Sequence, residues 1–123
     1  MSYLHTPVIY LQDKDIDQNG NVANPKLPTH LPMVVMVQAS WCGHCVSAKP
    51  DFQKFADETD GKVTCCTVQK DGKEPGESDL GDRVGEFDDE FKGFPHYMLY
   101  RGGKRVKGQL TGRDVASLHK FVT

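Results

Sequence analysis

Two cysteines separated by two residues are the feature of this sequence that most directly implies chemistry. Cys42 and Cys45 lie in the string SWCGHC, which follows the apolar run MVVMVQAS. If a buried strand ends and a helix begins at Cys42, the free N–H groups of the first helical turn and the helix dipole stabilise a thiolate there. The thiolate is the nucleophilic form of cysteine, and the spacing places Cys45 one turn further along the same side of the helix. The pattern therefore predicts a redox-active pair that closes a disulfide.

The residues around the pair favour the same interpretation. Gly43 adds no side chain to the turn between the cysteines, and the Trp41 ring would cover one side of the pair. A protonated His44 beside Cys42 would stabilise the thiolate further, and stabilising the reduced form makes the disulfide a stronger oxidant. We expect Cys42 to exchange with the substrate and Cys45 to resolve the mixed disulfide.

A metal site is the main chemical alternative, because the spacing C-x-x-C is also half of a zinc site. The other two cysteines, Cys65 and Cys66, are adjacent in a predicted strand. Their side chains then point to opposite faces of the sheet, so the two cannot both bind one tetrahedral metal ion without distortion. We expect them to be small buried residues, with a regulatory or intermolecular thiol pair as the alternative. A metal or iron–sulfur module, and a peptide-binding domain without turnover, stay open as alternatives to an enzyme.

The elements that must position Cys42 and Cys45 follow from the pattern of apolar and turn-forming residues. Five strands are expected, at Pro7–Gln12, Met33–Ser40, Lys62–Gln69, His96–Arg101 and Arg105–Leu110. The first helix is expected from about Cys42 to Thr59, kinked at Pro50, with an apolar face of Val46, Phe52, Phe55 and Ala56. A short helix is expected around Arg83–Phe91, and a last helix capped by Thr111, with an apolar stripe of Val115, Leu118 and Val122. This order predicts a mixed α/β fold.

The composition suits one soluble domain over residues 1–123, with an irregular segment at about 13–32 and an acidic, glycine-rich loop at about 71–82. Hydrophobic residues make up 37% and charged residues 26% of the chain, and no apolar run is long enough to span a bilayer. The net charge of −2 predicts no general attraction to nucleic acid or to a membrane surface. The ends of the chain resemble neither a secretory signal nor a retention signal, so we expect a cytoplasmic monomer.

The sequence resembles the thioredoxin superfamily over roughly Pro7 to Phe121. Four features carry the resemblance: WCGHC after an apolar strand, Pro50 five residues beyond Cys45, the GFP string that ends at Pro95, and a closing hairpin followed by a helix. WCGHC matches the catalytic domains of protein disulfide isomerases, while the length is closer to that of a thioredoxin. The resemblance implies a thioredoxin fold, with a central mixed β-sheet flanked by helices. It also implies thiol–disulfide exchange with protein substrates, with no cofactor and no metal.

The resemblance also assigns roles around the cysteine pair. In that family the proline matching Pro95 is cis and packs beside the disulfide, and the backbone of the preceding residue, here Phe94, pairs with the substrate chain. Trp41 and Gly93 would complete a shallow apolar groove for an extended segment that carries a cysteine. Arg113 matches the arginine that disulfide isomerases carry before their last helix, where a cation near the second cysteine lowers its pKa.

The direction of electron flow stays open at this point. The string WCGHC favours oxidation or isomerisation, and it is typical of oxidising compartments. The expected cytoplasmic location favours a reductase. In either direction, a thiol or a reductase partner must exchange electrons with the pair.

One position departs from the family pattern. Family members carry a buried Asp or Glu six residues before the first cysteine, where it takes the proton of the second cysteine; here that position is Met36. A methionine cannot titrate, so we expect Cys45 to lose its proton less readily than in typical members.

The substitution Met36→Glu tests this expectation. It should accelerate the release of substrate from a mixed disulfide, because a carboxylate beside Cys45 can accept its proton. Stopped-flow release rates of the wild type and the variant provide the measurement, with Met36→Gln as a polar control that accepts no proton. An unchanged rate in Met36→Glu would count against the expectation.

Overall fold

A five-stranded sheet forms the centre of the computed structural model, which describes residues 3–123. Its strands are β1 (Ile9–Tyr10), β2 (Met33–Gln38), β3 (Thr64–Gln69), β4 (His96–Arg101) and β5 (Lys104–Val106), in the order β1-β3-β2-β4-β5. β1, β3 and β2 run parallel, whereas β4 and β5 are antiparallel to their neighbours. The sheet is therefore mixed, as the sequence predicted.

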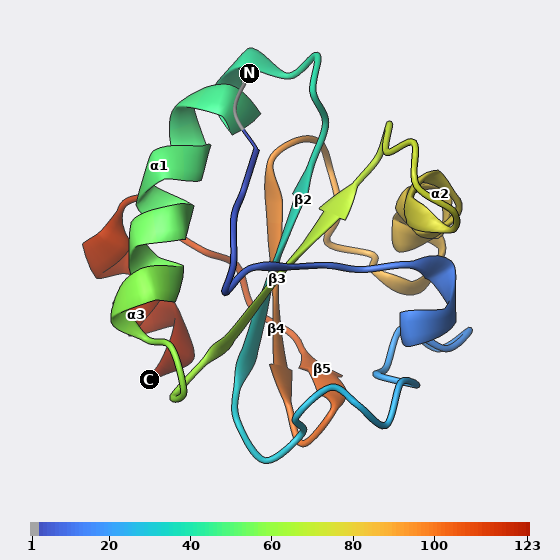
Figure 1. The fold of residues 1–123 in the computed structure, drawn as a ribbon, viewed down its shortest axis with the longest axis horizontal. Helices are drawn as coiled ribbons and strands as arrows, with labels where there is room; N and C mark the ends of the chain where they lie inside the picture. Colours follow the sequence, from blue (N-terminus) through green and yellow to red (C-terminus); the bar gives the residue numbers. More distant parts are fainter. Residues whose placement is uncertain (1–2) are drawn as a thin grey trace.

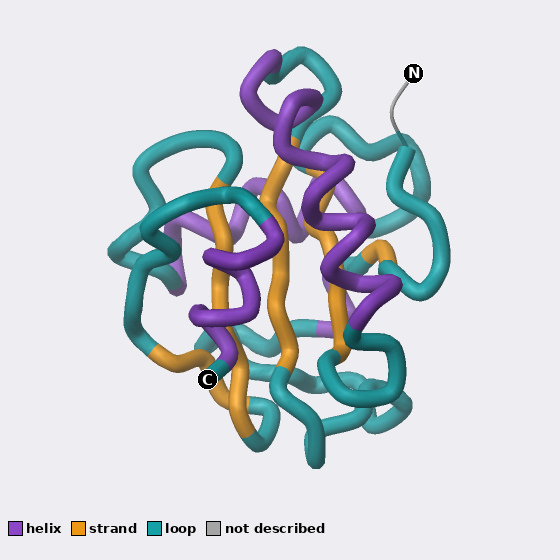
Figure 2. The backbone as a smooth tube through the Cα atoms, turned by 90° about the vertical axis from the view of Figure 1, so that its left-hand side faces the viewer, coloured by secondary structure: helices purple, strands orange, loops and turns teal. Residues whose placement is uncertain are grey.

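Helices cover both faces of this sheet. α1 (Gly43–Glu58) and α3 (Val115–Val122) lie on one face, and α2 (Glu77–Phe87) lies on the other (Figure 1). The view turned by 90° shows α1 and α3 side by side in front of the strands (Figure 2). No helix within residues 3–123 is long and apolar enough to cross a membrane.

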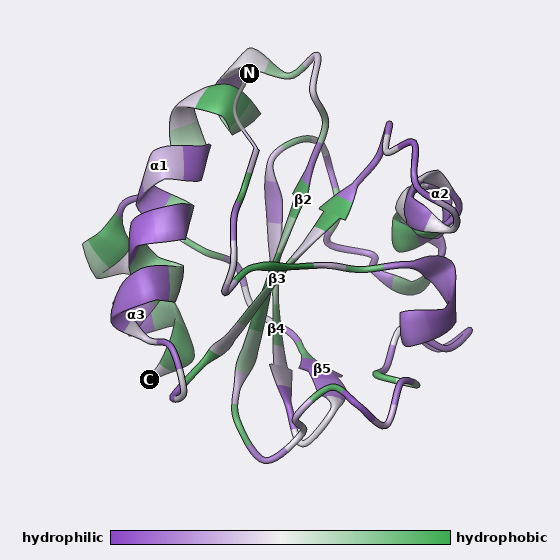
Figure 3. Ribbon diagram, in the orientation of Figure 1, coloured by the Kyte–Doolittle hydropathy of each residue, from purple (hydrophilic) through white to green (hydrophobic). Residues whose placement is uncertain are grey.

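The central strand β2 is buried along its whole length, because helices cover it on both sides. Its alternate side chains enter two separate apolar clusters: Val34 and Met36 pack with residues of α1 and α3, while Val35 and Val37 pack with residues of α2. Figure 3 shows this apolar interior along β2 and β3, with hydrophilic residues on the outer faces of the helices. A strand buried on both faces gives the continuous apolar run seen in the sequence.

Four of the five expected strands are shorter in the structure: β2 ends at Gln38 instead of Ser40, β3 begins at Thr64 instead of Lys62, and the first and last strands differ most. The first spans only Ile9–Tyr10 instead of Pro7–Gln12, because Pro7 has no N–H to donate and the chain turns into a 3-10 helix at Asp13–Asp15. The return strand of the hairpin ends at Val106 instead of Leu110. Beyond it, Lys107 binds Asp89 and the Gly108 N–H donates to the Glu90 carboxylate, so the chain leaves the sheet edge.

The helices also differ from the expectation at three points. α2 occupies Glu77–Phe87 rather than Arg83–Phe91, because Leu80 reaches the core from the segment expected as a loop and packs there with Val84 of the expected helix. The cap of α3 is Asp114 and not Thr111, since the Asp114 carboxylate accepts the Ser117 N–H at 3.1 Å. Val46 lies outside the core with 42% of its surface exposed, whereas Phe52, Phe55 and Ala56 are buried as expected.

The segment expected to be irregular, residues 13–32, is held in place by residues from distant parts of the chain. Arg83 of α2 donates to the Asp13 carboxylate at 2.6 Å and to the Ile16 carbonyl at 2.8 Å. The hydroxyl of Tyr100 in β4 donates to the Gly20 carbonyl at 2.7 Å. This segment therefore covers the α2 side of the sheet with a defined conformation.

A buried carboxylate fixes the segment that leads from α2 into β4. Asp88 ends α2, and its side chain is fully buried. It contacts His96 Nε2 at 2.6 Å and Arg105 Nη1 at 3.2 Å, and it accepts the Glu90 N–H at 2.9 Å. These contacts tie the segment after Asp88 to β4 and β5, and this segment carries Phe94 and Pro95.

The substitution Asp88→Ala should reduce the free energy of unfolding by about 3–5 kcal/mol, because it leaves the nearly buried Arg105 with only its longer contact to Glu90, at 3.7 Å. Urea denaturation of the two proteins gives the difference. The neighbouring Asp89→Ala is the matched control, since Asp89 and its partner Lys107 are both exposed, and it should leave the stability nearly unchanged. Equal losses in the two variants would contradict a special role for Asp88.

Candidate active site

Cys42 lies where β2 has ended and α1 begins. It is the N-cap of α1, in an extended conformation, and its sulfur accepts the backbone N–H of Cys45 at 3.1 Å. The Cys42 residue is 7% exposed. A sulfur at the positive end of a helix, bonded to a free N–H of the first turn, is placed to carry negative charge and to act as a nucleophile.

Cys45 lies one turn deeper and is completely buried. Burial raises the pKa of its thiol, and its contact with the Cys42 thiol acts in the same direction. The charge of Lys49 acts in the opposite direction and favours the thiolate. Both cysteines are free thiols in this structure. The two sulfurs therefore differ in access, since the first is near the surface and the second lies in the core.

Gly43 and His44 form the exposed outer side of this first turn. A Cβ added to Gly43 would meet no atom within 4 Å outside its own helix turn. The glycine therefore leaves open space in front of the cysteine pair, and no packing contact requires it.

Trp41, which directly precedes Cys42, contacts Phe94 of the segment 93–95. The Trp41 ring is 66% exposed and meets Phe94 edge to face, with ring centroids 5.3 Å apart. The peptide bond between Phe94 and Pro95 is cis. An exposed tryptophan against a second aromatic ring forms an apolar surface of the kind that binds protein segments.

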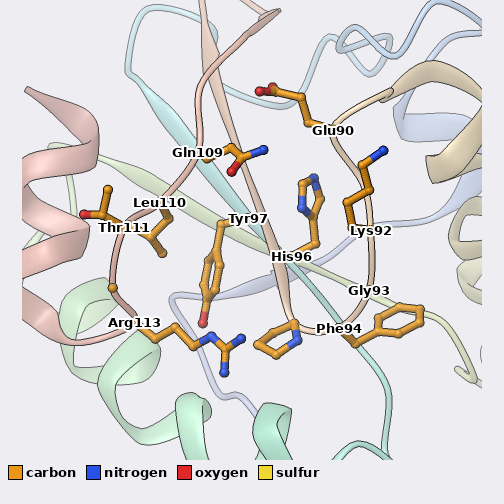
Figure 4. Close-up of a pocket in the computed structure, with 12 residues that line it drawn as sticks. Glu90, Lys92, Gly93, Phe94, His96, Tyr97, Gln109, Leu110, Thr111 and Arg113 are labelled. Atoms are coloured by element: carbon orange, nitrogen blue, oxygen red, sulfur yellow. The ribbon is translucent and has the colours of Figure 1, made fainter.

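A groove of about 650 Å³ begins at this aromatic surface. Gly93, Phe94, Pro95, Leu110 and Arg113 are among the residues that line it, and Figure 4 shows Phe94 on one side and Leu110 and Arg113 on the other. Arg113 is exposed and lies in the loop before α3. Figure 4 shows its guanidinium turned toward the hydroxyl of Tyr97.

Tyr97 was not singled out by sequence reasoning. It lies in β4 opposite Met36 of β2, and both side chains belong to the cluster that includes Cys42 and Cys45. Its buried hydroxyl has no hydrogen-bond partner among the residues that the structure describes. Burial raises the pKa of this phenol, and the Arg113 charge opposes the rise.

Sequence reasoning also missed three polar residues on the other side of α1. Lys49, Asp71 and Ser40 line a second cavity, of about 930 Å³. Asp71 accepts the Ser40 N–H at 3.0 Å and also binds the Ser40 hydroxyl. Burial opposes the ionisation of Asp71, but these hydrogen bonds from Ser40 outweigh it and lower the pKa of the carboxyl. The spacing of four residues between Cys45 and Lys49 was the available signal, because it places both on one helix face.

The metal alternative has no geometric support in the described part of the chain. Within residues 3–123, no group of three or more His, Cys, Asp or Glu side chains is placed to hold a metal ion. Cys65 and Cys66 are both buried, and their side chains enter the two different apolar clusters, as expected for neighbours in a strand. Burial raises the pKa of the Cys65 thiol to about 12 and raises that of Cys66 as well.

Comparison with known proteins identifies relatives of this chain. Residues 19–123 match the family described as Thioredoxin. The putative thioredoxin-like protein 453L of Invertebrate iridescent virus 6 is 40% identical, over 98% of this chain and 95% of its own length. Protein disulfide-isomerase 2-3 of Arabidopsis thaliana is 30% identical over 72% of this chain, which spans 18% of that larger protein.

Solved structures share the fold at lower sequence identity. Form I of human ERp44 superposes with a TM-score of 0.70 at 21% identity, over 98% of this chain and 30% of that one. The Trx4 domain of ERdj5 superposes with a TM-score of 0.65 at 20% identity, over 94% of this chain and 91% of that domain.

The difference in burial between Cys42 and Cys45 predicts unequal alkylation by iodoacetamide. In the reduced protein at pH 7, Cys42 should react at least about tenfold faster than Cys45, whose raised pKa leaves little thiolate. Because the Cys45 pKa is raised, its thiolate fraction and its rate should grow about tenfold per pH unit above pH 7. Peptide mapping by mass spectrometry measures each site, with the buried Cys66 as an internal reference. Equal rates at pH 7 would contradict the assignment.

Proposed function

The chain belongs to the thioredoxin family, and from that premise we propose that it is a thiol–disulfide oxidoreductase that acts on protein cysteines. The observation that carries the proposal is the position of the Cys42 sulfur. It accepts the Cys45 N–H at the start of α1, and it lies next to the surface formed by Trp41 and Phe94.

In the reducing direction, the Cys42 thiolate attacks one sulfur of a substrate disulfide. The substrate S–S bond breaks, and its electron pair leaves with the other substrate sulfur as a thiolate, while Cys42 holds the first in a mixed disulfide. The Cys45 thiolate then attacks Cys42 Sγ, which releases the substrate sulfur that Cys42 held and closes the Cys42–Cys45 disulfide. The substrate gains two electrons that the cysteine pair loses. The same steps in reverse oxidise a substrate dithiol.

The substrate that we propose is an extended protein segment that carries a cysteine or a disulfide. The exposed Trp41 ring and Phe94 offer it an apolar contact at the opening of the groove, and Gly93 and Pro95 continue that groove. Arg113 stands at the far end, where its charge can meet a polar group of the bound segment. A thiol or a reductase partner returns the pair to its starting state.

We further propose that the pair has an oxidising, isomerase-like potential. His44 supports this, because it lies in the first turn of α1 next to Cys42. An imidazolium there stabilises the thiolate, and stabilisation of the reduced state raises the reduction potential.

The reduction potential of the Cys42–Cys45 pair tests the proposal, and equilibration with glutathione buffers measures it. We expect a value near that of protein disulfide isomerase, about −180 mV, and not near that of thioredoxin, about −270 mV; the gap corresponds to about 4 kcal/mol for two electrons. The variant His44→Pro should shift the value downwards.

Each result has a distinct meaning. A value near the lower figure would assign a reductase and overturn the oxidising proposal. The variant Cys45→Ser should form a stable mixed disulfide with a substrate peptide, and Cys42→Ser should form none at the active site. If the wild type formed no mixed disulfide through Cys42, the proposed exchange reaction itself would be wrong.

A further inference from the structure

A lysine is buried in α1 beside the deeper of the two cysteines. Lys49 is only 6% exposed, although lysines are almost never fully buried unless they are paired. Burial of an ammonium group is costly because it loses contact with water. The position of Lys49 therefore requires a compensating interaction with negative charge.

Three groups favour the charged form of Lys49: the Asp71 carboxylate, and Cys45 and Cys42 when either is a thiolate. Cys45 precedes it by four residues on the same face of α1, and Asp71 follows β3 and lines the same cavity. The backbone N–H and the hydroxyl of Ser40 both donate hydrogen bonds to the Asp71 carboxylate. Ser40, in turn, comes directly before the string that contains the cysteine pair. Lys49 thus shares a cavity with a fixed carboxylate and a helix face with Cys45, and the charges of both act on it.

A hydrogen bond with the Ala39 backbone, just after β2, favours the Cys45 thiolate more than the Lys49 charge does, but it supplies no positive charge. β2 contributes no titratable side chain, and its Met36 is buried in the same cluster as Cys45. β4 contributes the phenol of Tyr97, on which the charge of Arg113 acts. α1 itself contributes Cys42, whose thiol disfavours a second negative charge nearby. Lys49 is the cation whose charge favours the Cys45 thiolate.

We propose that the Lys49 ammonium is the counter-charge of the Cys45 thiolate when Cys45 resolves the mixed disulfide. The inference rests on the proposed exchange reaction and names a residue for its second step. Cys45 loses its proton, its thiolate bonds to Cys42 Sγ, and the bond between Cys42 and the substrate sulfur breaks. The electron pair leaves with that sulfur, which gains a proton, so that protons and electrons balance without any further reactant.

The electrostatic environment of Lys49 supports this role. Burial lowers the pKa of the amine, while the charges of Cys45 and Asp71 oppose that fall and favour the ammonium form. Lys49 also lines the cavity of about 930 Å³ that it shares with Ser40 and Asp71. The cavity gives the amine a route to solvent, so the cation can persist next to a sulfur that is itself fully buried.

The first experiment measures Cys45 directly and requires no substrate. In the Cys42→Ser background, the rate of Cys45 alkylation by iodoacetamide is followed from pH 6 to pH 10 by peptide mapping, with and without Lys49→Met. Loss of a nearby cation raises a thiol pKa by about one unit or more. The thiolate fraction of Cys45 then falls about tenfold at neutral pH. A thiolate of higher pKa is also about threefold more nucleophilic, so we expect the alkylation rate of Cys45 to fall about threefold in total.

Two further variants separate charge from packing. Lys49→Arg keeps the positive charge and should restore most of the Cys45 reactivity, which a role in packing alone does not predict. Lys54→Met removes an exposed lysine from the same helix and should leave the Cys45 rate unchanged. If Lys49→Met reacted as fast as the parent, or if Lys49→Arg were as slow as Lys49→Met, the inference would be overturned.

The second experiment measures the resolving step. A chromophoric peptide is joined to Cys42 as a mixed disulfide, and its release is followed by stopped flow in the protein with Cys45 intact. Lys49→Met should slow the release about threefold, while the formation of the mixed disulfide by Cys42 changes less. A wild type that forms no mixed disulfide would overturn the proposed function, whereas the alkylation rates would still decide the role of Lys49.

Discussion

The bond from the Cys45 N–H to the Cys42 sulfur joins the two cysteines across the first turn of α1, and the rest of the site depends on where that turn lies. The turn follows β2, a strand buried along its whole length between two apolar clusters. Because helices cover both faces of β2, the strand cannot shift without disrupting the packing of at least one apolar cluster. The start of α1 is therefore fixed relative to the sheet, and with it the two sulfurs.

The second half of the site comes from a segment that has no regular secondary structure. The segment between Asp88 and β4 carries Phe94 and Pro95, and Asp88 holds it through His96 and Arg105. This arrangement brings Phe94 against Trp41, although the two are separated by more than fifty positions in the chain. A buried ion pair thus positions an apolar surface, because the charged groups have few alternative partners once they leave water.

Unequal burial gives the two sulfurs different chemistry on the same helix. Cys42 lies at the helix end, where N–H groups lack partners, and Cys45 lies where the core raises the pKa of its thiol. A thiol in the core is stable as long as it stays neutral, since an isolated charge there is costly. The charge of Lys49 favours the Cys45 thiolate, the Asp71 carboxylate favours the charged form of Lys49, and Lys49 and Asp71 line the same cavity.

The sequence by itself determined the order of the elements, the mixed sheet and the cysteine pair. Those follow from short-range patterns: the apolar run of β2, the spacing of Cys42 and Cys45, and the hairpin glycines before β5. Element ends were less predictable, since α2 begins where Leu80 reaches the core and α3 begins at the Asp114 cap. Tertiary structure alone decided the pairing of Asp88 with Arg105, the burial of the Tyr97 hydroxyl, and the cavity that Lys49 shares with Asp71. Each of these depends on which elements pack together, and charge acts through distance and burial, neither of which local sequence patterns encode.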